Sequence, residues 1–265
     1  MIAVFTPTKR PGGLDLTIAC LSRQTVSDFV WIVQDELLGS RIGVYDKAYY
    51  NEHIEVEFLM VPKKSGKHRN LAAAYNVAAE KALELGADYL VSLQDYIWIP
   101  NDGLEMFLEV HDAVDRAIVT GLTSHSEKPT KDDIADINGS YTIFKRPLTG
   151  KPEGISWADV RAIDLYPEDH IKTLKCRPEH WEANWASIDM KLIKEGIRWD
   201  EDYDVGVAYE NMDFAVQVVE AGGTCVLDKR NHAVSLPHKT YFDGEQEEIE
   251  QHSNRERFEQ KWMIG

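Results

Sequence analysis

The sequence lacks the features that mark several common classes of protein. It has only three cysteines (Cys20, Cys176 and Cys225), and none of them form a CxxC pair. We therefore expect reduced thiols, with neither a disulfide framework nor a zinc site. No apolar run approaches the ~18 residues of a transmembrane helix, and the first residues lack the basic and apolar regions of a signal peptide. These absences predict a cytoplasmic protein.

Positive charge is also scarce. The chain has 29 Lys and Arg against 45 Asp and Glu, a formal net charge of -16. Such a field repels phosphate backbones, which excludes nucleic acid as a generic partner but leaves room for a local basic pocket that binds a small phosphorylated ligand. Neither GxGxxG nor GxxxxGK[ST] occurs in the sequence, so dinucleotide-binding and P-loop sites have no motif to support them.

The first hundred residues alternate between apolar strands and helices. The pattern predicts strands and helices in the order 2–6, 14–23 (helix), 29–33, 54–62, 67–86 (helix) and 89–93. This rhythm is typical of an α/β fold, with a mostly parallel central sheet and helices on both of its faces.

The rest of the chain is less regular. Helices are predicted at 102–114, 186–196, 210–223 and 245–262, and strands at 117–124 and 224–228, whereas residues 125–180 show no clear pattern. No low-complexity linker divides the sequence. We therefore predict one domain over 1–265, with a nucleotide-like half (1–100), a more irregular second half (101–240) and a charged C-terminal helix (241–265).

Polar residues follow three of the predicted strands, at 6–10, 34–36 and 94–95. Ligands of open α/β sheets bind at the carboxyl ends of the strands. The basic segment 63–69 and the helix after it are suited to hold a diphosphate. Without a glycine-rich loop, a diphosphate calls for a divalent cation, which prefers oxygen ligands, and Asp95 is the natural anchor.

Each of these candidate site residues also has a purely structural explanation. Asp95 is equally compatible with a turn former, and the basic segment with a solvated loop. Glu210 and Asp213 lie three residues apart on one helix face, where carboxylates complement the helix dipole.

Taken together, the segments resemble glycosyltransferases of the GT-A fold, closest to the family-two group. The resemblance is carried in order by "IAVFTPTKRPGGLDLTIACLSRQTVSDFVWIVQDE", "KHRNLAAAYNVAAEKALELGADYLVSLQDYIWIP", "NWASIDMKLIKEGIRWDEDYDVGVAYENMDFAVQVVEAGG" and "HAVSLPHKTYF", with a terminal F-x-x-K-W. It covers about 1–105 and 183–265.

The resemblance implies a transferase that moves a sugar from a UDP-sugar to an acceptor hydroxyl with the help of Mn²⁺ or Mg²⁺. It implies metal binding by Asp95 and His238, with His232 a weaker candidate. The positions implied at the reaction centre are Glu210, Asn211 and Asp213. The nucleotide-sugar contacts that it implies are Pro7, Thr8, Arg10, Asp35, Arg69, Asn76, Gln94 and Trp185.

Two positions depart from the family pattern. Aligned from Pro100, the Asp-x-Asp motif reads Leu93-Gln94-Asp95, so its first aspartate is missing. Asn211 stands where inverting members carry the acid that takes the acceptor's proton, and "ENMD" is similar to the helix of retaining polypeptide N-acetylgalactosaminyltransferases. Retaining chemistry, Glu210 as the base, and a catalytically weak or inactive sugar-nucleotide-binding protein all stay open. A nucleotidyltransferase is a further alternative, but "PTKRPGGLD" lacks that class's glycine-rich pattern.

Overall fold

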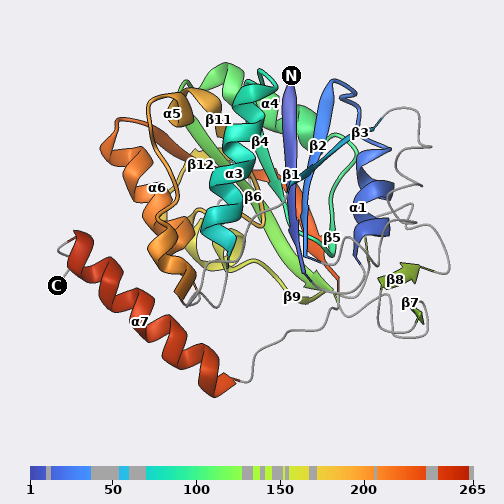
Figure 1. Ribbon diagram of the computed structural model, residues 1–265. Helices are drawn as coiled ribbons and strands as arrows, with labels where there is room; N and C mark the ends of the chain where they lie inside the picture. The colour runs from blue at the N-terminus through green and yellow to red at the C-terminus, as the bar shows by residue number, and fades with distance from the viewer. Residues whose placement is uncertain are drawn as a thin grey trace.

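The computed structural model describes residues 1–9, 13–36, 54–59, 70–126, 134–137, 141–144, 152, 155–166, 172–205, 208–236 and 244–262. Its centre is a ten-stranded sheet in the order β10-β12-β6-β11-β4-β1-β2-β3, with β5 paired to β12 and β9 to β6 (Figure 1). A separate two-stranded sheet joins β7 (Ile134–Ile137) and β8 (Tyr141–Phe144).

The first half of the central sheet is parallel. Its strands are β1 (Ile2–Thr8), β2 (Phe29–Asp35), β3 (Glu55–Leu59) and β4 (Tyr89–Leu93). All but the edge strand β3 are largely buried, as the continuous apolar runs in the sequence predict. The α/β fold class expected from the sequence is confirmed.

The second half of the sheet is mixed. β11 runs antiparallel to both β4 and β6, while β12 runs parallel to β6 and antiparallel to β10. The strands are β5 (Ile97–Trp98), β6 (Ala117–Ser126), β9 (Ile155–Trp157), β10 (Thr173–Lys175), β11 (Trp185–Asp189) and β12 (Thr224–Ser235). β12 runs seven residues beyond the predicted strand, past a register shift between Asp228 and His232.

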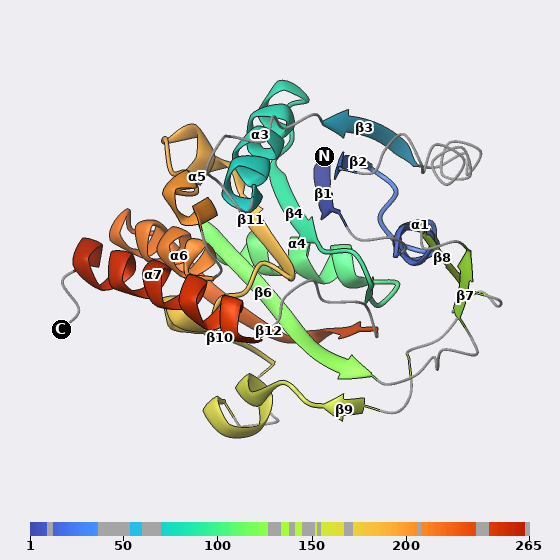
Figure 2. The same ribbon diagram turned by 60° about the horizontal axis from the view of Figure 1, so that its bottom comes forward.

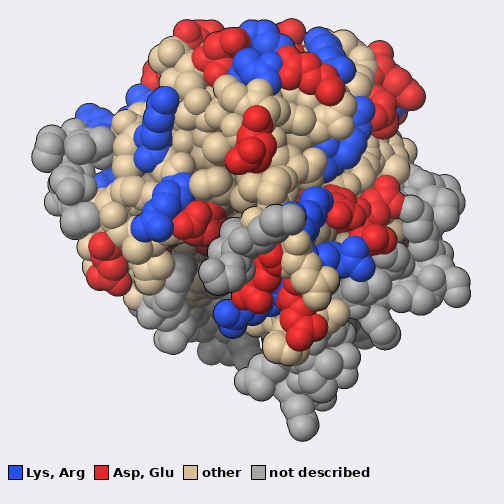
Figure 3. Space-filling view, turned by 90° about the vertical axis from the view of Figure 1, so that its left-hand side faces the viewer, with Lys and Arg blue, Asp and Glu red and all other residues tan. Residues whose placement is uncertain are grey.

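Helices cover both faces of the sheet (Figures 1 and 2). Apolar side chains of α1 (Leu14–Leu21) and α4 (Gly103–Ala113) share one core, whereas those of α3 (Leu71–Glu84), α5 (Met190–Lys194) and α6 (Glu210–Glu220) share the other. The long helix α7 (Gly244–Trp262) lies beside α6 (Figure 2). The face that carries these last helices shows acidic and basic side chains interspersed (Figure 3). No helix in the described part of the chain is long and apolar enough to cross a bilayer.

The prediction of a single helix over 186–196 is wrong. Residues Trp185–Asp189 form β11, and only Met190–Lys194 are helical. All five β11 residues are buried, with Trp185 in one core and Ala186 and Ile188 in the other. Pairing with β4 and β6 on both sides supplies hydrogen bonds and burial that outweigh the local helix propensity.

His111 is a titratable group buried beneath the sheet. Its Nε2 lies 2.8 Å from Ser187 Oγ, and its ring stacks on Tyr89 at 4.4 Å between centroids. Burial, and to a lesser extent the charge of Lys191, lowers the pKa of His111 from 6.5 to about 4. The neutral ring is therefore the form that the folded protein accommodates.

Acid should destabilise the protein through His111. The unfolded chain binds a proton near pH 6.5 but the folded chain only near pH 4, so stability is full above pH 6.5 and falls as the pH drops to about 4. The loss is about 3 kcal/mol. Urea unfolding of His111→Gln across this range should show a correspondingly shallower dependence on pH. The control His252→Gln changes an exposed histidine of α7. An unchanged slope in His111→Gln would contradict the prediction.

Candidate functional site

The carboxyl ends of β1, β2 and β4 bring polar side chains together. Thr8 and Asp35 are paired in the β1–β2 register, and the Glu36 N–H donates to the Thr8 carbonyl oxygen at 3.0 Å. The Thr8 hydroxyl donates to Asp95 Oδ2 at 2.8 Å. Asp95 is only 2% exposed. The residues predicted from the strand ends therefore lie at one edge of the sheet, and Pro7 precedes Thr8 in β1.

The chain turns sharply directly after Asp95. Tyr96 has φ = 63°, a left-handed conformation that costs a non-glycine residue about 1–2 kcal/mol. Gly13 faces this turn with φ = 84°, and a Cβ atom there would lie 2.8 Å from the Tyr96 ring. The Leu236 N–H donates to the Tyr96 carbonyl oxygen at 2.8 Å. The end of β12 is thereby tied to the turn that carries Asp95.

The approach to β11 borders the other side of β4. The Gln94 N–H donates to the Asn184 carbonyl oxygen at 3.1 Å, and the Ala183 carbonyl oxygen accepts from Ser92 Oγ and from the Tyr75 hydroxyl. Burial raises the pKa of Tyr75, and the nearby charge of Glu210 adds to the rise, while hydrogen bonds from Ser92 and Gln94 oppose it. Tyr75 therefore stays a neutral phenol that bridges α3 to the sheet edge.

The amino end of α6 lies near Tyr75, because the charge of Glu210 acts on the Tyr75 phenol. Glu210 is 9% exposed, and Asn211 Nδ2 donates to its Oε1 at 2.9 Å. Trp199 Nε1 donates in turn to Asn211 Oδ1 at 3.2 Å. Ala208 and Tyr209 precede this pair with φ values of 65° and 68°. Two consecutive strained residues immediately before a buried carboxylate are typical of a functional site.

A stack of three aromatic rings joins α3 to α6. The Trp199 ring lies 4.6 Å from that of Tyr75 and 3.8 Å from that of Phe214, nearly parallel to both. Asn76 holds the backbone of Trp199: its Nδ2 donates to the carbonyl oxygen at 2.9 Å and its Oδ1 accepts from the N–H at 3.0 Å. Asn76 also donates to Glu201 Oε1 at 3.2 Å. The predicted nucleotide contact thus has a structural role in this fold.

Trp185 lies in the core. It is 0% exposed, its Nε1 donates to Asn231 Oδ1 at 2.7 Å, and its ring packs on Phe107. A Cβ atom at Gly121 would lie 2.6 Å from the Trp185 ring, so a glycine is needed at this contact. Because Trp185 has no exposed surface, it cannot contact a bound sugar, and the structure does not support its predicted place in the site.

Asp213 anchors the C-terminal helix. This carboxylate is 0% exposed and lies 2.9 Å from Lys261 Nζ, and it accepts from Trp262 Nε1 at 2.9 Å and from Gln217 Nε2 at 2.8 Å. The predicted helix-face carboxylate therefore fixes α7 to α6. The terminal F-x-x-K-W motif supplies its countercharge and one of its hydrogen bonds.

Helix α7 also braces the strained segment before Glu210. Asn254, 0% exposed, donates from Nδ2 to the carbonyl oxygens of Tyr203 and Ala208, both at 3.0 Å. The Phe258 ring packs on that of Tyr209 at 5.6 Å between centroids. The position of the Glu210 carboxylate therefore depends on the docking of α7.

Removing the countercharge of Asp213 should be costly. Lys261→Met leaves a buried carboxylate without its cation, so we expect a loss of about 3 kcal/mol in the free energy of unfolding. The matched control is Arg255→Met on the same helix. Arg255 forms an exposed pair with Glu259, so its loss should change the stability much less. Urea denaturation measures both changes. Equal effects of the two substitutions would rule out Asp213 as the anchor.

Several predicted residues lie outside the described part of the chain: Arg10, Arg69 and His238. His232 is described, and its Nε2 lies 2.7 Å from Ser124 Oγ on the neighbouring strand β6.

The residues at the carboxyl end of β4 fit a metal ion that binds together with the substrate. In the described part of the chain, no three His, Cys, Asp or Glu side chains form a metal-binding group. Asp95 is one carboxylate at the strand end. Mg²⁺ is commonly bound through one or two carboxylates together with substrate phosphates, so the site fits an ion shared with a diphosphate.

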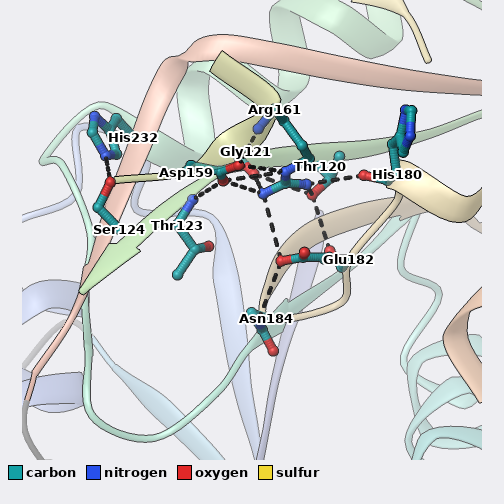
Figure 4. A network of polar contacts seen from close by, with 10 residues as sticks. All are labelled: Thr120, Gly121, Thr123, Ser124, Asp159, Arg161, His180, Glu182, Asn184 and His232. Atoms are coloured by element: carbon teal, nitrogen blue, oxygen red, sulfur yellow. Dashed lines mark hydrogen bonds and ion pairs between the residues drawn. The ribbon is translucent and has the colours of Figure 1, made fainter. Parts of the chain in front are cut away.

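A polar network that the sequence does not predict centres on Arg161 (Figure 4). Arg161 and Asp159 are each 3% exposed and form an ion pair at 2.6 Å. Asp159 also accepts from the Thr123 N–H at 2.8 Å, and Glu182 lies 3.5 Å from Arg161. Burial works against the charge on Asp159, but Arg161 lowers the pKa of Asp159 overall. The only signal in the sequence is an Asp-x-Arg pair, which is too common to attract notice.

Comparison with solved structures identifies the fold. The chain is similar to residues 1–349 of S. aureus TarS in complex with UDP, with TM-score 0.57 and 13% identity over 89% of this chain and 60% of that one. It is also similar to GalNAc-T7 with UDP, GalNAc and Mn²⁺, with TM-score 0.59 and 12% identity over 98% of this chain and 49% of that one.

The chain has the GT-A fold. The resemblance stated from the sequence is confirmed at this level, and its structural neighbours are glycosyltransferases. No protein-family model and no curated protein sequence matches the chain. The chain spans at most about 60% of the length of these solved neighbours.

Proposed function

We propose that this protein is a glycosyltransferase that moves a sugar from a UDP-sugar to an acceptor hydroxyl. The observation that carries the proposal is the hydrogen-bonded pair of Thr8 and Asp95 at the carboxyl end of the sheet, in a fold shared with UDP-bound proteins. Ligands of open α/β sheets bind at this edge. The strained turn at Tyr96 is a second, independent sign of function there.

The donor lies along the edge in this proposal. Pro7, Thr8 and Asp35 border the nucleoside, and Gln94 and Asp95 the diphosphate, with Arg10 and Arg69 contributing cations. A Mn²⁺ or Mg²⁺ ion would be held by Asp95, by the diphosphate and by His238. When bound, such an ion stabilises the negative charge that develops on the leaving diphosphate.

Glu210 is the proposed proton acceptor. The acceptor oxygen bonds to the anomeric carbon, the bond from that carbon to the phosphate oxygen breaks, and the acceptor's proton passes to Glu210. Asn211 cannot take a proton, but its hydrogen bond to Glu210 Oε1 orients the carboxylate. The strained residues Ala208 and Tyr209, braced by Asn254, fix where the helix begins.

One alternative has an observation in its favour. Both ends of the Asn211 amide are engaged, by Trp199 and by Glu210, at the position where inverting family members carry an acid. A sugar-nucleotide-binding protein without turnover would need no more than this. Such a protein binds the same ligand and releases no UDP from it.

Ligand binding is tested first by thermal shift. UDP with Mn²⁺, present at 100 times its Kd, should stabilise the protein by about 2.7 kcal/mol relative to the ligand-free state, which is more than UDP alone achieves at the same concentration. Asp95→Ala should abolish the increment due to metal. The control Asp102→Ala removes an exposed carboxylate that makes no side-chain cap bond, and it should leave the increment intact. A metal increment that survives Asp95→Ala removes Asp95 from this role.

Turnover is tested with Glu210→Gln. Release of UDP from a UDP-sugar should fall at least ~100-fold, because the proton acceptor is lost, while UDP affinity stays the same. Glu220→Gln, an exposed change at the far end of α6, is the control. If Glu210→Gln keeps its activity, the proton leaves with the phosphate instead. If the wild type binds UDP-sugars and never releases UDP, the binding-protein alternative holds.

A further inference from the structure

Glu182 and Asn184 lie at the same sheet edge as Asp95. β11 runs antiparallel to β4, so the residues that lead into β11 lie beside the carboxyl end of β4. The Gln94 N–H donates to the Asn184 carbonyl oxygen at 3.1 Å, which fixes this proximity. The two side chains therefore border the region assigned to the diphosphate.

The turn that carries both side chains meets the face of the sheet covered by α3 and α6. Ala183, between them, packs into the core formed with α3, α5 and α6, and its carbonyl oxygen accepts from the Tyr75 hydroxyl of α3 at 3.3 Å. Asn184 Nδ2 donates to Glu182 Oε2 at 3.4 Å, which places the Glu182 carboxylate beside it (Figure 4).

Among the residues that the structure describes, only one of the two Glu182 carboxylate oxygens has a bonding partner. Glu182 Oε2 meets Asn184 and lies 3.5 Å from Arg161, whereas within the described part of the chain no residue bonds Oε1. The side chain is 45% exposed. Burial raises the pKa of Glu182, and the charge of Arg161 opposes that rise. A partly dry carboxylate with an unused oxygen is a strong hydrogen-bond acceptor.

Arg161 provides a fixed support for Glu182. It bonds to both oxygens of Asp159, to Thr120 Oγ1 at 3.0 Å, and to the carbonyl oxygens of Gly121 and His180, both at 3.0 Å. A guanidinium engaged on all sides cannot swing toward a ligand. Its role is to hold the carboxylate in place.

The sheet order gives the reach of the site. From β2 through β1 and β4 to β11 there are three steps of about 4.8 Å, or about 14 Å in all. With the nucleoside at β1 and β2 and the diphosphate at β4, the next group along the donor is the sugar, which falls at the approach to β11. Along the sequence, the strained residue Tyr96 precedes Glu182 and Asn184, and the strained pair Ala208–Tyr209 follows them, immediately before Glu210.

We propose that Glu182, together with Asn184, binds hydroxyl groups of the transferred sugar and determines which sugar is accepted. The inference rests on the proposed function, because it assumes a nucleotide sugar along this edge. Glu182 accepts hydrogen bonds from sugar hydroxyls, and Asn184 can both donate and accept. A site built to bond a hydroxyl rejects an analogue in which that group is missing or misdirected.

The test compares binding of UDP with binding of its sugar conjugates. Calorimetry in Mn²⁺ would give Kd for UDP, UDP-glucose, UDP-galactose, UDP-N-acetylglucosamine and UDP-N-acetylgalactosamine. The wild type should bind one conjugate more tightly than UDP. Glu182→Gln should weaken that conjugate by about tenfold or more and leave UDP within twofold. Asn184→Ser should likewise weaken binding of the conjugate relative to binding of UDP.

The matched control is a glutamate close to Glu182 in the sequence that is not assigned to the site. Glu179→Gln makes the same change three residues away, on an exposed glutamate paired with Arg177, and should leave every Kd unchanged. Equal preference for the conjugate over UDP in the wild type and Glu182→Gln overturns the assignment of Glu182. If the wild type binds UDP but no conjugate more tightly, sugar recognition at β11 is excluded and nucleotide binding stands. If it binds neither, the proposed function falls as well.

Discussion

The candidate site depends on β4, which pairs with a different strand on each of its two sides. On one side β4 hydrogen-bonds in parallel to β1, and on the other side in antiparallel fashion to β11. The parallel neighbour ends at the same edge as β4, so Thr8 meets Asp95 there. The antiparallel neighbour begins at that edge, so the chain around Asn184 arrives beside Gln94. Because β4 has one parallel and one antiparallel neighbour, side chains from both halves of the chain meet at its carboxyl end. If β11 were parallel to β4, the residues that lead into β11 would lie at the opposite edge of the sheet.

Much of the first half was predictable from the sequence. The buried strands there are continuous apolar runs closed by breakers, and the alanine-rich helix α3 has a period that only a helix satisfies. β11 was not predictable, because a strand buried on both faces loses the alternation that would reveal it, and "ASIDMKLI" has good helix formers. Its conformation comes from the partners on either side, which local propensity does not encode.

The candidate site divides along a similar line. Positions fixed by the strand ends, such as Thr8, Asp35 and Asp95, follow from topology alone. Asn76, Trp185 and Asp213 were assigned to the site from the resemblance alone, yet their polar groups are bonded to Trp199, Asn231 and Lys261. A sequence motif gives the identity of a residue but not the atoms that satisfy its hydrogen bonds, so binding and structural roles look alike until the partners are known. Arg161 and Glu182 were missed for the converse reason, because nothing in their sequence neighbourhood signals that they meet.

The stacked rings of Tyr75, Trp199 and Phe214 have an optical consequence. Aromatic rings held parallel in an asymmetric setting give strong near-ultraviolet circular dichroism, which vanishes when fixed packing is lost. Because Trp199 also bonds to Asn211, a shift of α6 against α3 would alter this signal without any added label. Near-ultraviolet circular dichroism therefore reports whether α3 and α6 keep their relative positions.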